Sequence, residues 1–172
     1  MMIYATIVLA IISRFVPHMP NVGLVTALAI FSAANMDWKK SLGITLTTRF
    51  VSDIFLGFFA WPVMLAVYAS HLAGILFGVW IKRVQNHRWL KIIASSLGAS
   101  VVFFLVTNFA YLYVEYPHNF AGIVLAYTNG LPFLRGTMIG DVGYSVLLFG
   151  VYQLAMYLKS KKSATKFLIS NS

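Results

Sequence analysis

The chain has 172 residues, of which 60% are hydrophobic and 10% are charged. Its mean hydropathy is +0.82, and a soluble domain of this length cannot hide that much apolar surface in one core. Composition therefore excludes a soluble enzyme and predicts an α-helical protein embedded in the lipid bilayer. The net charge of +9 does not indicate a nucleic-acid partner, because the basic residues gather at the ends of apolar segments.

Six apolar segments of suitable length are separated by charged or turn residues, and we expect each to cross the membrane. They lie at about 2–16, 22–36, 41–58, 62–81, 89–113 and 133–158. The fold class is thus a six-transmembrane-helix bundle, with residues 1–158 as one domain and 159–172 as a basic cytoplasmic tail. Phe120 to Tyr127 is moderately apolar but too short to cross, so we expect a re-entrant or interfacial segment before the last helix.

The basic residues favour one side of this bundle. The side of the membrane that holds the N-terminus receives ten basic residues. The opposite side receives Arg14, and Arg135 lies near the boundary of that side. Lysine and arginine concentrate in cytoplasmic loops. We therefore expect both termini to be cytoplasmic and the protein to lie in the cell's inner (cytoplasmic) membrane. The ten are Lys39, Lys40, Lys82, Arg83, Arg88, Lys91, Lys159, Lys161, Lys162 and Lys166.

Few polar residues lie within or beside the expected spans. Each requires a structural or functional explanation, because an isolated charged side chain in a bilayer is unfavourable in free energy. Arg49 and Asp53 are four residues apart, so they can meet on one helix face. An ion pair that neutralises itself and a direct role in ligand binding remain equally open for them. Most of the other polar residues fall on the outward side, as expected for an outward-opening pocket. The candidate substrate-binding residues are Arg14, His18, Asn21, Asn108, Tyr116, Arg135 and Asp141.

Catalytic chemistry has little support in the sequence. Nucleophile-elbow, zinc-protease and phosphate-loop motifs are missing, so we predict neither catalytic residues nor enzyme activity. The chain has no cysteine, and its four histidines lack close metal-ligand spacing, so we predict neither a metal site nor a cofactor. Three pairs of small residues permit close helix approach, namely Gly74 and Gly78, Gly136 and Gly140, and Ala29 and Ala33. Packing inside the chain is the favoured role for such pairs, with docking of a partner as the alternative.

A set of short motifs extends from Arg14 to Gly150. It comprises Arg14, Pro17, His18, Pro20 and Asn21, then Ala27 to Phe31, Ser52, Asp53 and Gly57, Thr107 to Phe109, Pro132 and Phe133, and finally Gly140, Asp141, Tyr144, Phe149 and Gly150. As a set these motifs resemble an uncharacterised family of small bacterial membrane proteins that is similar to the substrate-binding S components of energy-coupling factor (ECF) transporters.

The resemblance implies six helices, an outward-facing pocket and a vitamin or similar micronutrient as substrate. It also implies, as partners, a transmembrane coupling subunit and ATPases. S components that share a coupling module typically carry an Ala-x-x-x-Ala motif on the first helix, whereas this chain offers only Ala5 and the pair Thr6 and Ala10. A solitary or dedicated arrangement is therefore open as well.

The favoured function is that of a membrane-embedded substrate-binding subunit for uptake of a small micronutrient. Three arginines against two aspartates among the polar residues favour a substrate with an anionic group. In this interpretation Arg49 and Asp53 form a supporting ion pair behind the pocket. The first alternative is an accessory or structural subunit of a larger membrane complex. The second, weaker alternative is a lipid-modifying enzyme, for which only Glu115 and His118 offer an acid and a base.

Overall fold

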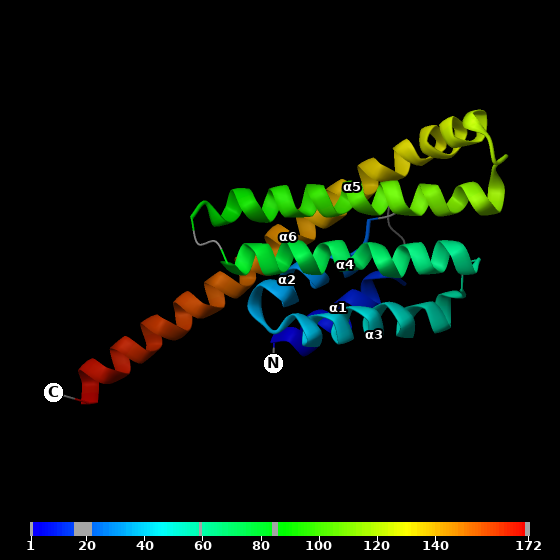
Figure 1. Cartoon of the computed structure of the whole chain (residues 1–172). Helices are drawn as coiled ribbons and strands as arrows, with labels where there is room; N and C mark the ends of the chain where they lie inside the picture. The colour runs from blue at the N-terminus through cyan, green and yellow to red at the C-terminus, as the bar shows by residue number, and fades with distance from the viewer. Residues whose placement is uncertain (1, 16–21, 59, 84–85, 171–172) are drawn as a thin grey trace.

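The computed structural model describes residues 2–15, 22–58, 60–83 and 86–170. These residues form six α-helices, namely α1 (Met2–Ser13), α2 (Val25–Asn35), α3 (Trp38–Leu56), α4 (Trp61–Arg83), α5 (Arg88–Glu115) and α6 (Phe120–Ser170). Helices α4 and α5 lie side by side, and α6 crosses the bundle and extends beyond it at its C-terminal end (Figure 1).

Three helices are long and apolar enough to cross a bilayer: α4, α5 and the part of α6 from Phe120 to Lys161. Large apolar side chains remain exposed on the bundle, such as Trp61 and Leu76 of α4, as expected for surface that faces lipid. Among the described residues, α1 and α2 have only 12 and 11 residues, or ~18 and ~16 Å at 1.5 Å per residue. The hydrocarbon core is about 30 Å thick, so six complete spans remain a prediction.

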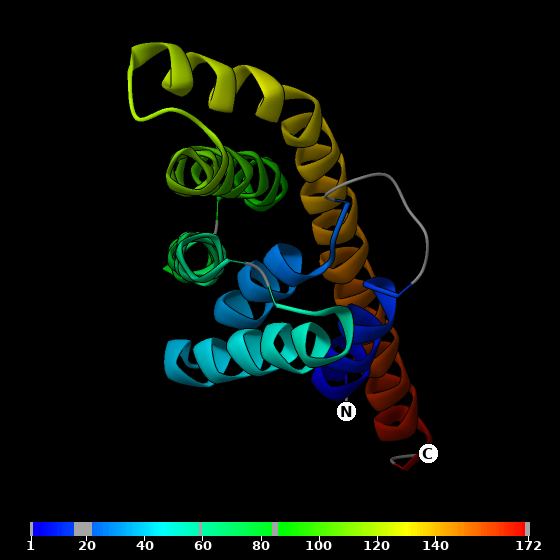
Figure 2. The same ribbon diagram turned by 90° about the vertical axis from the view of Figure 1, so that its right-hand side faces the viewer.

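Helix α2 is the centre of the packing. Every residue from Val25 to Ala34 is buried, because α3, α4, α5 and α6 all contact this helix. Phe31 packs edge-to-face against Phe149 of α6, with ring centres 5.2 Å apart. Figure 2, which looks along α4 and α5, shows the short blue α2 enclosed by its neighbours. This burial leaves α2 little surface for lipid.

Glycine explains the close approach of α2 and α4. A Cβ atom at Gly78 would lie 2.7 Å from the Cβ of Ala33 and would also collide with the carbonyl oxygen of Ile30. At Gly74, a Cβ would lie 3.2 Å from the Cβ of Ala29. The small-residue pairs of the two helices therefore face each other, which confirms the prediction that they pack inside the chain.

Helix α6 differs from the sequence prediction. A separate segment at residues 120–127 and a last span at 133–158 were expected, but one helix runs from Phe120 to Ser170 with Pro132 inside it. It also takes in most of the expected tail. Proline removes a backbone N–H donor and bends a helix rather than always ending it. Figure 2 shows the first, yellow part of α6 at an angle to the rest.

The connections place the basic residues together. The α2–α3 and α4–α5 connections and the C-terminal end of α6 lie at one end of the bundle, whereas the α3–α4 and α5–α6 connections lie at the other (Figure 1). Helix α3 begins at Trp38, α4 ends at Arg83 and α5 begins at Arg88. The predicted basic side of the protein is thus one end of the helix bundle.

Candidate functional site

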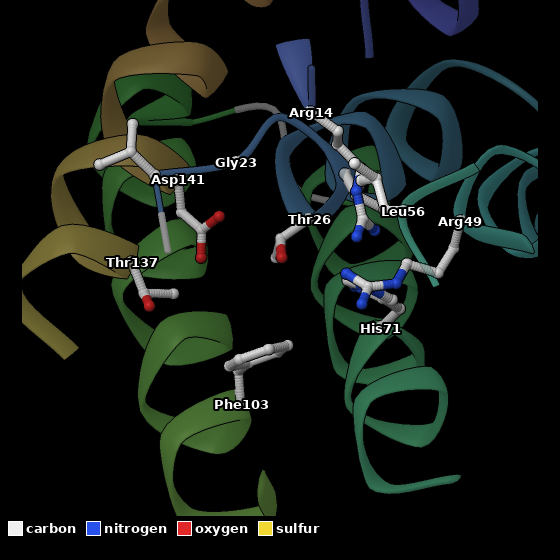
Figure 3. Close-up of a pocket in the computed structure, with 11 residues that line it drawn as sticks. Arg14, Gly23, Thr26, Arg49, Leu56, His71, Phe103, Thr137 and Asp141 are labelled. Carbon is white, nitrogen blue, oxygen red and sulfur yellow. The ribbon is translucent and has the colours of Figure 1, made fainter. Parts of the chain in front are cut away.

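A cavity of about 180 Å³ lies where the helices converge. All six helices or the turns next to them contribute to it. Its lining combines charged, hydroxyl and apolar side chains (Figure 3). The lining residues are Arg14, Val22, Gly23, Val25, Thr26, Arg49, Leu56, His71, Phe103, Thr137 and Asp141.

One wall of the cavity is built around Asp53, which is 1% exposed. The Nη2 atom of Arg14 lies 2.9 Å from its Oδ1, and Nε of Arg49 donates to its Oδ2 at 2.9 Å. The hydroxyl of Tyr68 donates to the same Oδ2 at 3.0 Å. The Arg49–Asp53 contact is the one that their spacing on α3 predicts. Two guanidiniums share one carboxylate, so this wall keeps an excess positive charge.

Arg14 reaches this wall from the turn that follows α1, where its backbone N–H bonds to the carbonyl of Ile11 at 3.1 Å. Its Nη1 atom is buried and has no hydrogen-bond partner among the described residues. A buried donor without a partner is unfavourable. A ligand in the cavity that accepts a hydrogen bond would satisfy it.

His71 lies on the same side of the cavity, in the middle of α4 (Figure 3). It is 2% exposed, and neither ring nitrogen has a hydrogen-bond partner within the described part of the chain. Its ring centre lies 6.0 Å from that of Phe103, which lines the cavity from α5. A neutral imidazole offers one donor and one acceptor, and His71 has both available at the wall of the cavity.

Asp141 of α6 forms the opposite side of the cavity together with Thr137, one turn earlier (Figure 3). It is 2% exposed, and the hydroxyl of Ser100 donates to its Oδ2 at 2.7 Å. The ion pairs among the described residues both involve Asp53, so no basic partner neutralises Asp141 there. The cavity therefore has a cationic wall and an acidic wall that face each other.

The predicted binding residues do not all meet at this cavity. Arg14 and Asp141 line it, as does Arg49 of the predicted supporting pair. Asn108 and Tyr116 instead line a second cavity of about 250 Å³ between the C-terminal part of α5 and the first turns of α6. Arg135 is exposed on α6 and lines neither of the two. His18 and Asn21 lie outside the described residues.

Sequence reasoning did not select His71, Thr26, Thr137 or Phe103, which all line the first cavity. For His71 a signal existed, because it is an ionisable residue in the middle of a predicted span and such residues are typically functional. Thr137 lies one helical turn before Asp141, so it shares a face with it. The aromatic Phe103 carries no comparable signal.

Together the three long apolar helices and the cavity among the helices indicate an α-helical membrane protein with a candidate small-molecule site inside its bundle. The chain belongs to the family described as "Family of unknown function (DUF6580)", whose model matches residues 1–165. No curated protein matches the chain, and no solved structure does.

Proposed function

We propose that this chain is a membrane-embedded substrate-binding subunit for uptake of a small micronutrient, similar to the S components of ECF transporters. The observation that carries the proposal is the cavity between Arg14, Arg49 and His71 on one side and Asp141 on the other. Buried polar groups without partners are unfavourable in a folded protein. A protein that keeps several of them around one cavity gains from a ligand that completes their hydrogen bonds.

The two walls indicate the chemistry of the ligand. An anionic group, such as a carboxylate, would accept from Arg14 Nη1 and from His71, and would balance the excess charge beside Asp53. A hydroxyl or amino group at the other end would donate to Asp141. We therefore expect a small acid that also carries a hydrogen-bond donor. The aromatic ring of Phe103 and the side chains of Val25 and Leu56 would contact its apolar part.

The size of the cavity also limits the ligand. Its volume of about 180 Å³ corresponds to about six water molecules, at roughly 30 Å³ each. Pockets for drug-sized ligands typically measure ~300–1,000 Å³. A compact, vitamin-like precursor or a short acid fits this space better than a large cofactor does.

The membrane arrangement belongs to the same proposal. Six spans, with the basic end of the bundle in the cytoplasm of the cell's inner membrane, would place the Arg14 and Asp53 wall toward the outer side. Because the chain shows no ATP-binding motif, transport would require other subunits, which we propose to be a coupling subunit with ATPases.

An accessory subunit of a larger complex is the competing proposal. It predicts that the small-residue faces contact neighbouring chains and that the polar residues leave no cavity. Gly74 and Gly78 instead face Ala29 and Ala33 of the same chain. The substrate-binding proposal accounts better for the cavity and for the ring nitrogens of His71, which lack a hydrogen-bond partner in the described part of the chain.

Native mass spectrometry of the protein, extracted gently from its own host, tests the proposal. We expect a retained small acid of at most a few hundred daltons, alone or with coupling and ATPase subunits. A ligand-free chain that is always bound to unrelated membrane subunits would contradict the proposal and support the accessory role.

A further inference from the structure

A third cavity, of about 630 Å³, lies at the basic end of the bundle, where α4 ends and α5 begins. It is separate from the two cavities described above and shares no lining residue with them. Helices α2, α4, α5 and α6 all contribute to it. Its lining residues are Ala34, Asn35, Ile81, Lys82, Arg88, Tyr152, Gln153 and Met156.

All the charged side chains that line this cavity are positive. Lys82 and Arg88 line it, and no lining residue is acidic. The ion pairs in the described part of the chain are both made by Asp53, so neither cation has a carboxylate partner there. Two like charges at one cavity repel each other unless an anion lies between them.

Both cations are held in place, and both retain donors. The Nζ of Lys82 donates to the carbonyl of Met36 at 3.0 Å, and an ammonium group has two further N–H donors. The guanidinium carbon of Arg88 lies 5.7 Å from the ring centre of the fully buried Phe149. This cation–π contact helps to position the guanidinium, while its buried Nε has no hydrogen-bond partner among the described residues.

The surroundings place this cavity near the membrane surface. Trp80 and Trp89 flank the α4–α5 connection and are 43% and 41% exposed, and exposed tryptophans of membrane proteins concentrate at the level of the lipid headgroups. The Nζ of Lys91 lies 5.9 Å from the ring centre of Trp80, which adds a third cation at this level. Ile81 and Met156 give the cavity an apolar part as well.

We infer that this cavity binds the phosphate group of an anionic phospholipid. Arginine binds phosphate through two parallel N–H bonds, and lysine adds a point charge. Basic pockets between transmembrane helices on the cytoplasmic side are suited to anionic headgroups. The apolar lining would contact the glycerol and the first acyl carbons, which a free phosphate lacks. This inference is independent of the ligand proposed for the cavity of Arg14 and Asp141.

Native mass spectrometry of the purified full chain in detergent, with lipid added at equal concentrations, tests this inference. The probes are phosphatidylglycerol, the zwitterionic phosphatidylcholine and inorganic phosphate. We expect the wild-type chain to retain phosphatidylglycerol over phosphatidylcholine. Retention should fall by on the order of tenfold in the double variant Lys82→Gln and Arg88→Gln. The matched control is Lys39→Gln with Lys40→Gln, which removes the same charge from exposed residues of α3 that do not line the cavity.

Equal retention of the two lipids by the wild-type chain would overturn the inference, and this comparison requires no variant to fold. An equal loss in the double variant and in the control would also overturn it, because net charge alone would then explain binding. A third outcome is saturable binding of inorganic phosphate that depends on Lys82 and Arg88, without retention of lipid. The cavity would then be a site for free phosphate, and the inference that it binds a phospholipid would be overturned.

Discussion

The guanidinium of Arg14 lies 2.9 Å from the carboxylate of Asp53, which joins the turn after α1 to the last part of α3. Arg49 binds the second oxygen of the same carboxylate. One buried acid thus holds two arginines, 12% and 11% exposed, at the wall of the candidate site. This geometry makes Asp53 the residue on which both the position of α1 and the shape of the wall depend.

Replacing Asp53 with asparagine should destabilise the protein strongly. The substitution removes the carboxylate that both guanidiniums bind, and removing one partner of a buried ion pair costs about 3–5 kcal/mol. Thermal unfolding in detergent measures the effect. The control is Glu115→Gln, which removes one acid at an exposed position. Equal melting temperatures for the two variants would contradict this prediction.

Replacing Gly78 with alanine should destabilise the packing of α2 against α4. The added methyl group would collide with Ala33 and with the backbone of Ile30, and overpacking of this kind costs about 1–3 kcal/mol. Gly43→Ala is the matched control, because a Cβ at that helical position meets nothing within 4 Å. There we expect a gain of about 0.5–1 kcal/mol. If Gly78→Ala unfolds at or above the wild-type temperature, α2 and α4 do not pack as described.

The membrane topology can be tested directly, because the chain contains no cysteine. Single variants Lys40→Cys, Arg83→Cys and His118→Cys each place a thiol at an exposed position. A membrane-impermeant maleimide should label His118→Cys on intact cells and the other two only after permeabilisation. This follows from the predicted cytoplasmic location of the basic end. Labelling of all three variants from one side would exclude the proposed topology.

The sequence predicts the regular, local features of the fold well. Spans expected at 62–81 and 89–113 correspond to α4 (Trp61–Arg83) and α5 (Arg88–Glu115), because long apolar runs leave little ambiguity. The Arg49–Asp53 contact follows from helical spacing alone. The separate segment expected at 120–127 was wrong, because α6 continues through Pro132 from that segment into the last expected span.

The composition of the site was harder to predict, since it depends on how the helices are rotated about their axes. Arg14 reaches Asp53 across 39 positions of the chain, and spacing within one helix carries no information on such a contact. Asn108 and Asp141 were grouped by their expected depth in the membrane, yet they line different cavities. Depth follows from the length of a span, whereas the direction in which a side chain points follows from packing.

Replacing Asp141 with asparagine should lower ligand retention without unfolding the protein. The amide oxygen can still accept the hydrogen bond from Ser100, which is 2.7 Å from the carboxylate. Removing a buried charge that has no ion-pair partner among the described residues also relieves its desolvation. We expect an unchanged or higher melting temperature and a ligand signal reduced by on the order of tenfold, as expected when a charge-assisted bond is lost. If the Asp141→Asn variant retained the ligand fully, Asp141 would not be a binding residue.

Replacing His71 with leucine separates a role in binding from a role in stability. His71 is buried and makes no hydrogen bond to a described residue. An apolar side chain of similar size should therefore maintain or raise the melting temperature, because it removes two buried polar atoms that have no hydrogen-bond partner among the described residues.

Ligand retention should fall sharply in His71→Leu if the imidazole binds the ligand, whereas His118→Leu, at an exposed position outside the cavity, should change neither quantity. Native mass spectrometry and thermal unfolding measure the two effects on the same samples. A large loss of stability in His71→Leu would show that the imidazole has a structural partner. Stable protein with undiminished ligand would show that the ligand binds elsewhere, and the cavity lined by Asn108 and Tyr116 would be the next to test.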